Sequence, residues 1–171
     1  MKEREGLVTM KGEPLTLLGD ELKAGDVAPD CEVVGKDLKP VKLSSFRGRV
    51  CIISSLPSLD TSVCNIMTRK FNEDAAALGS DVVVMAVSMD LPFAQDRWCV
   101  AADVKNVETF SDHRSASFGE AFGVLIKGLR LLARSVFVVD RKGVIHYLEI
   151  VDELSSEPDY EAALIAAKEL V

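Results

Sequence analysis

Cys64 is the residue of this sequence whose type and position best fit nucleophilic chemistry. It follows an apolar, β-branched run at Val50–Ser55 and a loop that starts at Pro57, and it stands where a helix is expected to begin. A helix N-terminus offers unpaired backbone N–H groups and the positive end of the helix dipole, and both favour an anion. The position therefore favours the thiolate, which is the nucleophilic form of cysteine. The alternative is that Cys64 is a small apolar residue on the buried face of its helix.

The residues just before Cys64 favour the chemical interpretation. Pro57, Thr61 and Cys64 are spaced as Pro-x-x-x-Thr-x-x-Cys in the segment PSLDTSVC. Pro57 can shield the sulfur from water, and the hydroxyl of Thr61 lies one turn before the cysteine, where it could donate to the thiolate. Thr is also a favoured N-cap residue, so Thr61 could cap the helix instead of, or in addition to, contacting the sulfur.

Apolar periodicity and turn residues predict the strands that must position Cys64. The predicted strands are Leu7–Met10, Leu15–Leu18, Cys31–Val34, Val41–Leu43, Val50–Ser55, Asp81–Ser88, Val107–Phe110, Ser135–Val139 and Val144–Ile150. The first two should form an N-terminal hairpin around the turn sequence KGEP, and the last two a hairpin around RKG.

Four helices are predicted between and after these strands. They are Cys64–Leu78, which Gly79 should end, a segment that begins at Pro92 and carries Cys99, Ala116–Phe122, and a last helix whose apolar stripe extends from Tyr160 to Val171. This order predicts an α/β fold with a mixed central sheet and helices on both faces. No internal repeat, low-complexity tract or linker interrupts the chain, so we expect one domain over residues 1–171.

Composition and charge argue against several classes of partner. The 171 residues are 48% hydrophobic, and a net charge of −7 without a Lys/Arg cluster argues against binding to nucleic acid. No apolar run is long enough to cross a bilayer, so no membrane association is expected. The opening residues MKEREGLVTM lack the apolar segment of a secretory signal, so we expect a cytoplasmic protein.

Cysteine and histidine usage argues against a metal site. No cysteine pair has CxxC spacing, and the chain has only two histidines, His113 and His146, so a zinc site is not expected. In the cytoplasm structural thiols stay reduced, so a disulfide there is more often transient and catalytic. Cys31 and Cys51 lie in predicted apolar strands, and we interpret both as buried core residues.

Five segments, together with the N-terminal hairpin, carry a resemblance that covers nearly the whole chain in order: PSLDTSVC, KFNEDAAAL, DLPFAQDRWC, LLARSVFVVD and EPDYEAAL. In these segments the chain resembles the thiol peroxidases of the peroxiredoxin superfamily, the atypical two-cysteine kind. PSLDTSVC is fairly specific to peroxiredoxins, and DLPFAQDRWC is specific to this subfamily. The resemblance implies a thioredoxin-like fold with an N-terminal β-hairpin extension.

The resemblance also assigns roles to individual residues. Cys64 matches the peroxidatic cysteine, and Thr61 and Pro57 match the residues that accompany it. Cys99, at the end of DLPFAQDRWC, matches the resolving cysteine, and Arg134, in LLARSVF, matches the arginine that holds the thiolate.

The position of Arg134 is compatible with that role. It immediately precedes the predicted strand Ser135–Val139, so it could lie at the end of the sheet beside the Cys64 loop. Its guanidinium is always charged and offers a rigid fork of donors, which could stabilise both a thiolate and the negative charge on a leaving oxygen. Without the family pattern, a surface arginine next to a strand would be the simpler interpretation.

The implied reaction reduces hydrogen peroxide and organic hydroperoxides to water and alcohols, as part of antioxidant defence. Cys64 would become a sulfenic acid, Cys99 would convert it into an intramolecular Cys64–Cys99 disulfide, and thioredoxin would restore both thiols. A disulfide needs Cα atoms roughly 4.4–6.8 Å apart. If the two helices hold the cysteines farther apart, at least one helix end must unwind. The chemistry requires no metal or organic cofactor, and the resemblance implies a homodimer.

Three other functions remain as alternatives. A disulfide oxidoreductase of the thioredoxin type needs two thiols one turn apart, and this chain has no CxxC. A Cys-His hydrolase would use His113 or His146 as the base and would leave the Thr61–Arg134 combination unexplained. A non-catalytic binding module could keep the fold, although a decayed enzyme tends to lose residues such as Cys64 and Arg134 first.

Overall fold

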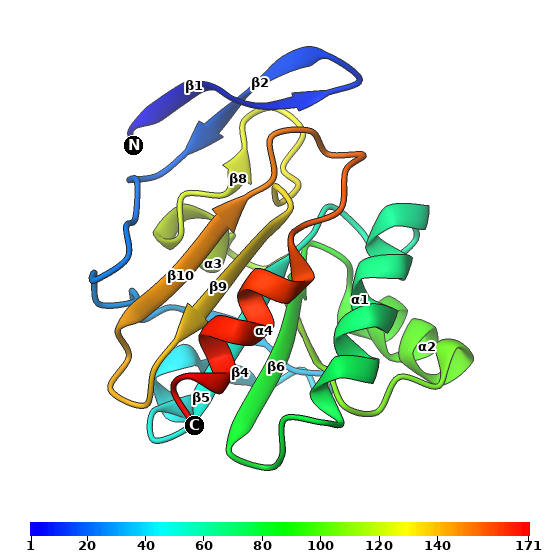
Figure 1. Cartoon of the computed structure of the whole chain (residues 1–171). Coiled ribbons are helices and arrows are strands. Elements are labelled where there is room, and N and C mark those ends of the chain that lie inside the picture. The colour runs from blue at the N-terminus through cyan, green and yellow to red at the C-terminus, as the bar shows by residue number, and fades with distance from the viewer.

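The computed structural model describes residues 1–171 and is built around a seven-stranded sheet. In spatial order its strands are β10 (Ile145–Ile150), β9 (Ser135–Val139), β5 (Val50–Ser55), β6 (Val82–Ser88), β7 (Glu108–Ser111), β3 (Glu32–Val34) and β4 (Pro40–Lys42). The central strands β5, β6 and β7 run parallel, whereas β9, β10, β3 and β4 are each paired antiparallel to their neighbours. The mixed sheet expected from the sequence is therefore confirmed (Figure 1).

The three longest helices cover one face of this sheet. They are α1 (Ser62–Ala75), α2 (Pro92–Ala102) and α4 (Tyr160–Lys168). Side chains of the central strands alternate between the faces, so Ile52 and Val84 pack in the cluster that contains these helices. Their neighbours Ile53 and Val83 pack in a second cluster on the opposite face. Burial on both faces explains why the central strands read as continuous apolar runs.

The opposite face is covered by smaller elements. They are a 3₁₀ turn η1 (Leu43–Phe46), a short helix α3 (Ser117–Ala121) and a three-stranded sheet of β1 (Glu3–Met10), β2 (Glu13–Leu18) and β8 (Leu125–Ile126). The predicted N-terminal hairpin is the β1–β2 pair, whose turn residues Lys11 and Gly12 both have positive φ (52° and 82°). Two consecutive left-handed residues are typical of a tight hairpin turn, and the second is a glycine.

Several strand boundaries agree with the sequence prediction to within one residue, but some elements differ. β1 begins at Glu3 rather than Leu7, because a register shift between Glu5 and Val8 lets pairing continue beyond the apolar run. β8 was not predicted, because a two-residue strand carries no periodicity.

Two helices end earlier than the apolar stripe predicted. α1 ends at Ala75, and the chain continues to Leu78 in tighter turns with bonds between residues three apart, such as Leu78 N to Ala75 O. α4 likewise ends at Lys168 rather than Val171. Leu78 is still buried, so the stripe predicted packing correctly but not helical hydrogen bonding.

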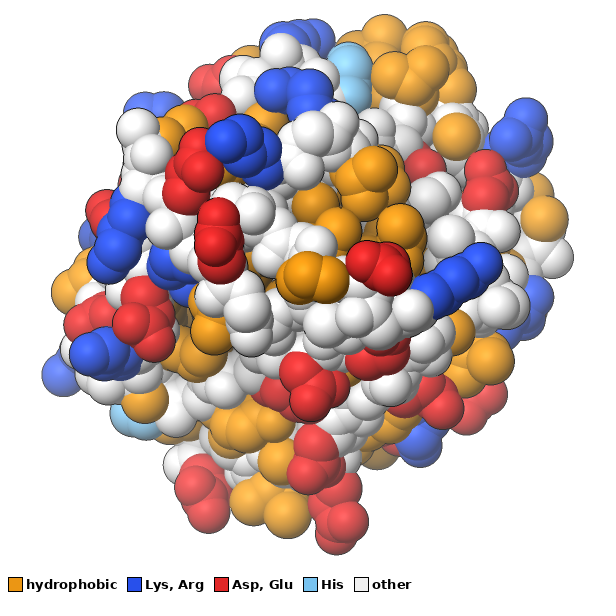
Figure 2. Space-filling model, turned by 90° about the horizontal axis from the view of Figure 1, so that it is seen from above, with side chains coloured by type: hydrophobic (Ala, Val, Ile, Leu, Met, Phe, Trp, Pro, Cys, Tyr) orange, Lys and Arg blue, Asp and Glu red, His pale blue; other side chains and the backbone are white.

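None of the helices combines the length and apolar composition that crossing a bilayer requires. Viewed from the hairpin end, the surface carries acidic and basic side chains interspersed with one another (Figure 2).

Candidate active site

Cys64 lies in the first turn of α1, directly after the loop that follows β5. The helix begins at Ser62, and Thr61 occupies its N-cap position. Cys64 is completely buried, with 0% of its surface exposed. Met67 and Phe71 share its buried helix face, as the sequence pattern predicted. A sulfur in the first turn of a helix stands next to backbone N–H groups that have no partner within the helix.

Arg134 brings a positive charge to this sulfur from the edge of β9. Its Nη1 donates to Cys64 Sγ at 3.2 Å and approaches Met67 Sδ at 3.6 Å. Its other two donors, Nε and Nη2, converge on the backbone carbonyl of Leu154, at 3.1 and 2.7 Å. Only 2% of Arg134 is exposed. The guanidinium is therefore held from one side and points its free edge at Cys64.

The buried charge of Arg134 has no carboxylate partner, because it takes part in none of the ion pairs of the structure. A buried charge without an opposite charge is unfavourable by several kcal/mol or more. The group that can supply a negative charge at hydrogen-bonding distance is Cys64. Negative charge that develops on Cys64 Sγ would therefore lie against a cation that no carboxylate neutralises.

Pro57 and Thr61 both precede Cys64 in the sequence, but the structure does not bring the Thr61 hydroxyl to the Cys64 sulfur. Thr61 Oγ1 donates to the carbonyl oxygen of Ser58 at 3.0 Å, and it makes no side-chain capping bond to α1. Thr61 is exposed, whereas Pro57 is buried in the loop before it. Neither the sulfur contact nor the cap considered for Thr61 is present in this arrangement.

Cys99 lies on α2, in the same apolar cluster as Cys64. Its thiol donates to Thr109 Oγ1 on β7 at 3.9 Å, and 9% of the residue is exposed. Burial raises the pKa of the Cys99 thiol, and the Thr109 contact and Lys36 only partly offset this effect. Cys64 and Cys99 are both free thiols with different partners. A bond between them therefore requires at least one sulfur to leave its place.

A hydrogen-bond network that sequence analysis did not identify connects the Cys64 loop with the start of α2. The Asp90 carboxylate accepts from Ser58 Oγ (2.7 Å), Leu59 N (2.9 Å) and Ser88 Oγ (2.7 Å). Gln95, buried on α2, donates to Ser88 Oγ at 3.0 Å. Asp90 opens the segment DLPFAQDRWC and Ser58 follows the active-site proline, which were the available sequence signals.

The two histidines lie in other contacts. His113 Nδ1 is bonded to Ser111 Oγ at 2.8 Å, and His146 Nε2 to Asp140 Oδ2 at 2.8 Å. Neither is hydrogen-bonded to Cys64, so the pairing that a Cys-His hydrolase requires is not formed.

Cys31 and Cys51 are buried core residues, as the sequence indicated. Burial raises the pKa of Cys31 to about 12 and that of Cys51 to about 11. No group of three or more His, Cys, Asp or Glu side chains is arranged to hold a metal ion.

Comparison with known proteins places this arrangement in a family. The family model described as Redoxin matches residues 23–164. A thiol peroxidase of Bacillus subtilis (strain 168) is 56% identical over 164 residues, which are 96% of this chain and 98% of that protein. A thiol peroxidase of Listeria innocua is 56% identical over 161 residues, 94% of this chain and 97% of that protein.

Solved structures share the fold. The crystal structure of a peroxiredoxin-like protein from Aquifex aeolicus superposes with a TM-score of 0.90 at 43% identity and covers 98% of this chain and 99% of that one. A thiol peroxidase from Chromobacterium violaceum has a TM-score of 0.82 at 22% identity, covers 91% of each chain and shares the fold. By its family match and by these closely similar relatives, the chain belongs to the redoxin family and, within it, to the thiol peroxidases.

Proposed function

We propose that this member of the thiol peroxidases reduces hydrogen peroxide and organic hydroperoxides at Cys64, as a thiol-dependent oxidoreductase. The observation that carries the proposal is the 3.2 Å contact between Cys64 Sγ and the buried guanidinium of Arg134, which has no carboxylate partner. A fixed cation stabilises the thiolate before the reaction and the negative charge on the leaving oxygen during it.

The first step is attack of the Cys64 thiolate on the terminal peroxide oxygen. A bond forms between sulfur and that oxygen, the O–O bond breaks, and the sulfur is oxidised to sulfenic acid. The leaving oxygen departs as hydroxide or alkoxide and takes up a proton to give water or an alcohol. Arg134 lies beside both charges, Pro57 limits access of water to the sulfur, and Thr61 is a candidate donor to the peroxide once the loop adjusts.

The second step is condensation of the Cys99 thiol with the sulfenic acid of Cys64. A disulfide forms and one water molecule leaves. The two thiols have separate partners, Arg134 and Thr109, which both sulfurs must leave or share for the bond to form. If their Cα atoms lie farther apart than a disulfide allows, the first turn of α1 or the segment around Cys99 unwinds in this step.

The third step restores both thiols at the expense of an external dithiol. Its thiolate attacks the disulfide, forms a mixed disulfide and is released in oxidised form. Thioredoxin is the proposed reductant, acting in the cytoplasm, and a homodimer is the proposed assembly. Membership of the thiol peroxidases, with bacterial relatives of similar length, supports these proposals. The proposed reaction serves antioxidant defence, and it needs no cofactor because sulfur carries the redox change.

A binding module that keeps the fold without catalysis is the competing function. It would not require a buried cation without a carboxylate partner beside a buried thiol, because an uncompensated buried charge lowers stability.

One assay separates the two. Hydroperoxide consumption is followed with a thioredoxin system for the wild type, Cys64→Ser and Cys99→Ser. We expect turnover in the wild type, none in Cys64→Ser, and turnover by Cys99→Ser only when dithiothreitol replaces thioredoxin. Absence of peroxide consumption by the wild type with either reductant would overturn the proposal.

A further inference from the structure

Glu153, in the loop between β10 and α4, holds the tip of the N-terminal hairpin. Its carboxylate accepts hydrogen bonds from the Thr9 hydroxyl (2.6 Å) and from the backbone N–H groups of Lys11 (3.0 Å) and Gly12 (3.2 Å). The hydroxyl and N–H of Ser155 add two more, at 3.0 and 3.3 Å. Both carboxylate oxygens are therefore occupied by donors.

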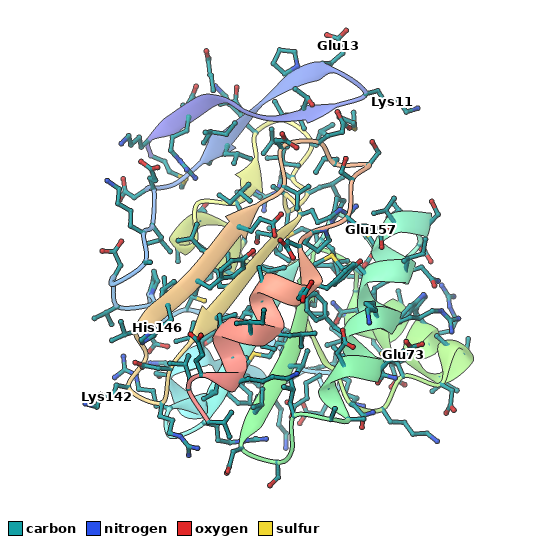
Figure 3. All side chains as sticks on the ribbon, viewed as in Figure 1. Lys11, Glu13, Glu73, Lys142, His146 and Glu157 are labelled. Atoms are coloured by element: carbon teal, nitrogen blue, oxygen red, sulfur yellow. The ribbon has the colours of Figure 1, made fainter.

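The hairpin turn is shaped to receive this carboxylate. Lys11 and Gly12 both have positive φ, and their successive N–H groups converge on the oxygens of Glu153. These bonds, with that of Thr9 the largest contributor, lower the pKa of Glu153 to about 2. Glu153 is therefore an anion at neutral pH, and its hydrogen bonds to the neutral donors of Thr9, Lys11 and Gly12, which we call the Glu153 clamp, are intact there. Figure 1 shows the orange loop after β10 passing beneath the hairpin tip, and Figure 3 labels Lys11 at that tip.

Glu153 immediately precedes Leu154 in the sequence, and the Leu154 carbonyl binds Arg134. Backbone bonds align the loop with β1, because Thr9 N donates to Asp152 O at 2.7 Å and Leu154 N donates to Thr9 O at 2.9 Å. The carbonyl of Leu154 then accepts both Nε and Nη2 of Arg134, whose remaining nitrogen faces Cys64. A continuous series of hydrogen bonds therefore connects the hairpin to the reactive sulfur.

We propose that Glu153 is a positioning residue for the peroxidase reaction, which fixes the Leu154 carbonyl and thereby the direction in which Arg134 points at Cys64. Leu154 lies in a loop, outside any strand or helix, so its position depends on such contacts. Because two of the Arg134 donors share this one acceptor, a shift of the carbonyl turns the guanidinium with it. The N-terminal hairpin thus acts on the active site without touching it. The inference rests on the function proposed above, since Glu153 acts only through Arg134 and Cys64.

The test compares Glu153→Gln with Glu157→Gln. Glutamine keeps the size of the side chain, but only one of its two terminal atoms can accept. Because Lys11 N and Gly12 N bind different oxygens of Glu153, at least one of these N–H groups loses its acceptor. Glu157 is a matched control in the same loop, exposed and bonded only to the Tyr160 hydroxyl, with no contact to the hairpin (Figure 3). The chain has a single tryptophan, Trp98, next to Cys99, so stopped-flow fluorescence can separate Cys64 oxidation by H2O2 from the later disulfide formation.

We expect Glu153→Gln to slow the oxidation of Cys64 on the order of tenfold, within the range produced by a small misplacement of a positioning group. Disulfide formation should keep its wild-type rate, and Glu157→Gln should match the wild type in both steps. In an Arg134→Gln background, Glu153→Gln should have no further effect on oxidation, because the group through which it acts is gone. A purely structural role for Glu153 would not produce this non-additivity.

Thr9→Val provides a second, milder variant, since it removes one donor to Glu153 but keeps the backbone pairing of the loop with β1. It should slow oxidation by a smaller factor in the same direction, and it decides the question if Glu153→Gln does not fold. Unchanged oxidation rates in the folded variants, or an equal loss in the Arg134→Gln background, would overturn the inference. A wild-type protein that consumes no peroxide would instead overturn the proposed function.

Discussion

Ser58 Oγ donates to Asp90 Oδ1 across 2.7 Å, which ties the loop before α1 to the loop before α2. The same carboxylate accepts from Leu59 N, so two donors of the segment that leads to Cys64 bind one acceptor in the segment that leads to Cys99. The two cysteines are therefore carried by elements that are braced against each other in the reduced protein.

This brace predicts a loss of stability when Asp90 is removed. Asp90→Ala leaves the donors of Ser58, Leu59 and Ser88, the last two of which are buried, without their acceptor. This loss should lower the free energy of unfolding by about 1–3 kcal/mol. Urea unfolding measures the change. Asp96→Ala, an exposed position on α2, serves as the control and should change stability by less than about 0.5 kcal/mol. Equal stabilities of the two variants would mean that Asp90 is not a brace.

Arg134 should not be replaceable by lysine. A lysine carries all its donors on one nitrogen, which cannot occupy the positions of the three guanidinium nitrogens that hold the Leu154 carbonyl and contact Cys64 Sγ. We expect Arg134→Lys to lower the second-order rate constant for oxidation by H2O2 by about 100-fold. Arg141→Lys, an exposed arginine near Gly48, should retain the wild-type rate. Retention of full activity by Arg134→Lys would show that charge alone suffices.

Cys31 and Cys51 should not react with alkylating reagents in the folded protein. Burial raises the pKa of Cys31 to about 12 and that of Cys51 to about 11, so both remain protonated thiols at neutral pH. Iodoacetamide treatment of the native protein at about pH 8 should leave Cys31 and Cys51 unmodified, whereas the unfolded chain should react at all four cysteines. Peptide mass analysis reads the outcome. Rapid alkylation of either residue in the folded protein would contradict the burial argument.

The raised pKa of Asp112 predicts that the stability of the protein depends on pH. It is buried and accepts hydrogen bonds from Phe118 N and Gly119 N of α3, yet desolvation raises its pKa from 3.8 to about 6. Between these values the folded protein binds more protons than the unfolded chain, so the contribution of Asp112 is fully present below 3.8 and is lost as the pH rises through about 6.

The comparison of wild type with Asp112→Asn isolates this contribution. Unfolding free energies measured between these two pH values should show the wild type losing stability relative to the variant as pH rises, by on the order of 2–3 kcal/mol. Parallel pH profiles would show that Asp112 titrates normally.

Local sequence signals predicted much of the fold. The apolar strands Val50–Ser55 and Ser135–Val139 were predicted with the bounds that the structure shows, because strands buried on both faces carry a continuous apolar run. The helix after Pro57 was also found, since Cys64, Met67 and Phe71 share one face. Helix ends were less predictable, because apolar contacts continue where helical hydrogen bonds stop.

Long-range contacts in the site could not be derived from local patterns. Arg134 and Cys64 are 70 positions apart, and Arg134 was singled out by family resemblance rather than by its surroundings. Leu154 contributes only a backbone carbonyl, for which no side-chain signal exists. The contact of Thr61 with Ser58 rather than with Cys64 reflects the path of the loop, which spacing alone does not fix.

The most direct test of the central claim is the mass of the protein after treatment with one equivalent of H2O2, mapped by peptide without reduction. The account predicts a loss of two hydrogens per chain and a cross-linked pair of peptides that contain Cys64 and Cys99. In Cys99→Ser it predicts the addition of one oxygen at Cys64. Oxidation located first at another cysteine, or an unreacted Cys64, would contradict it.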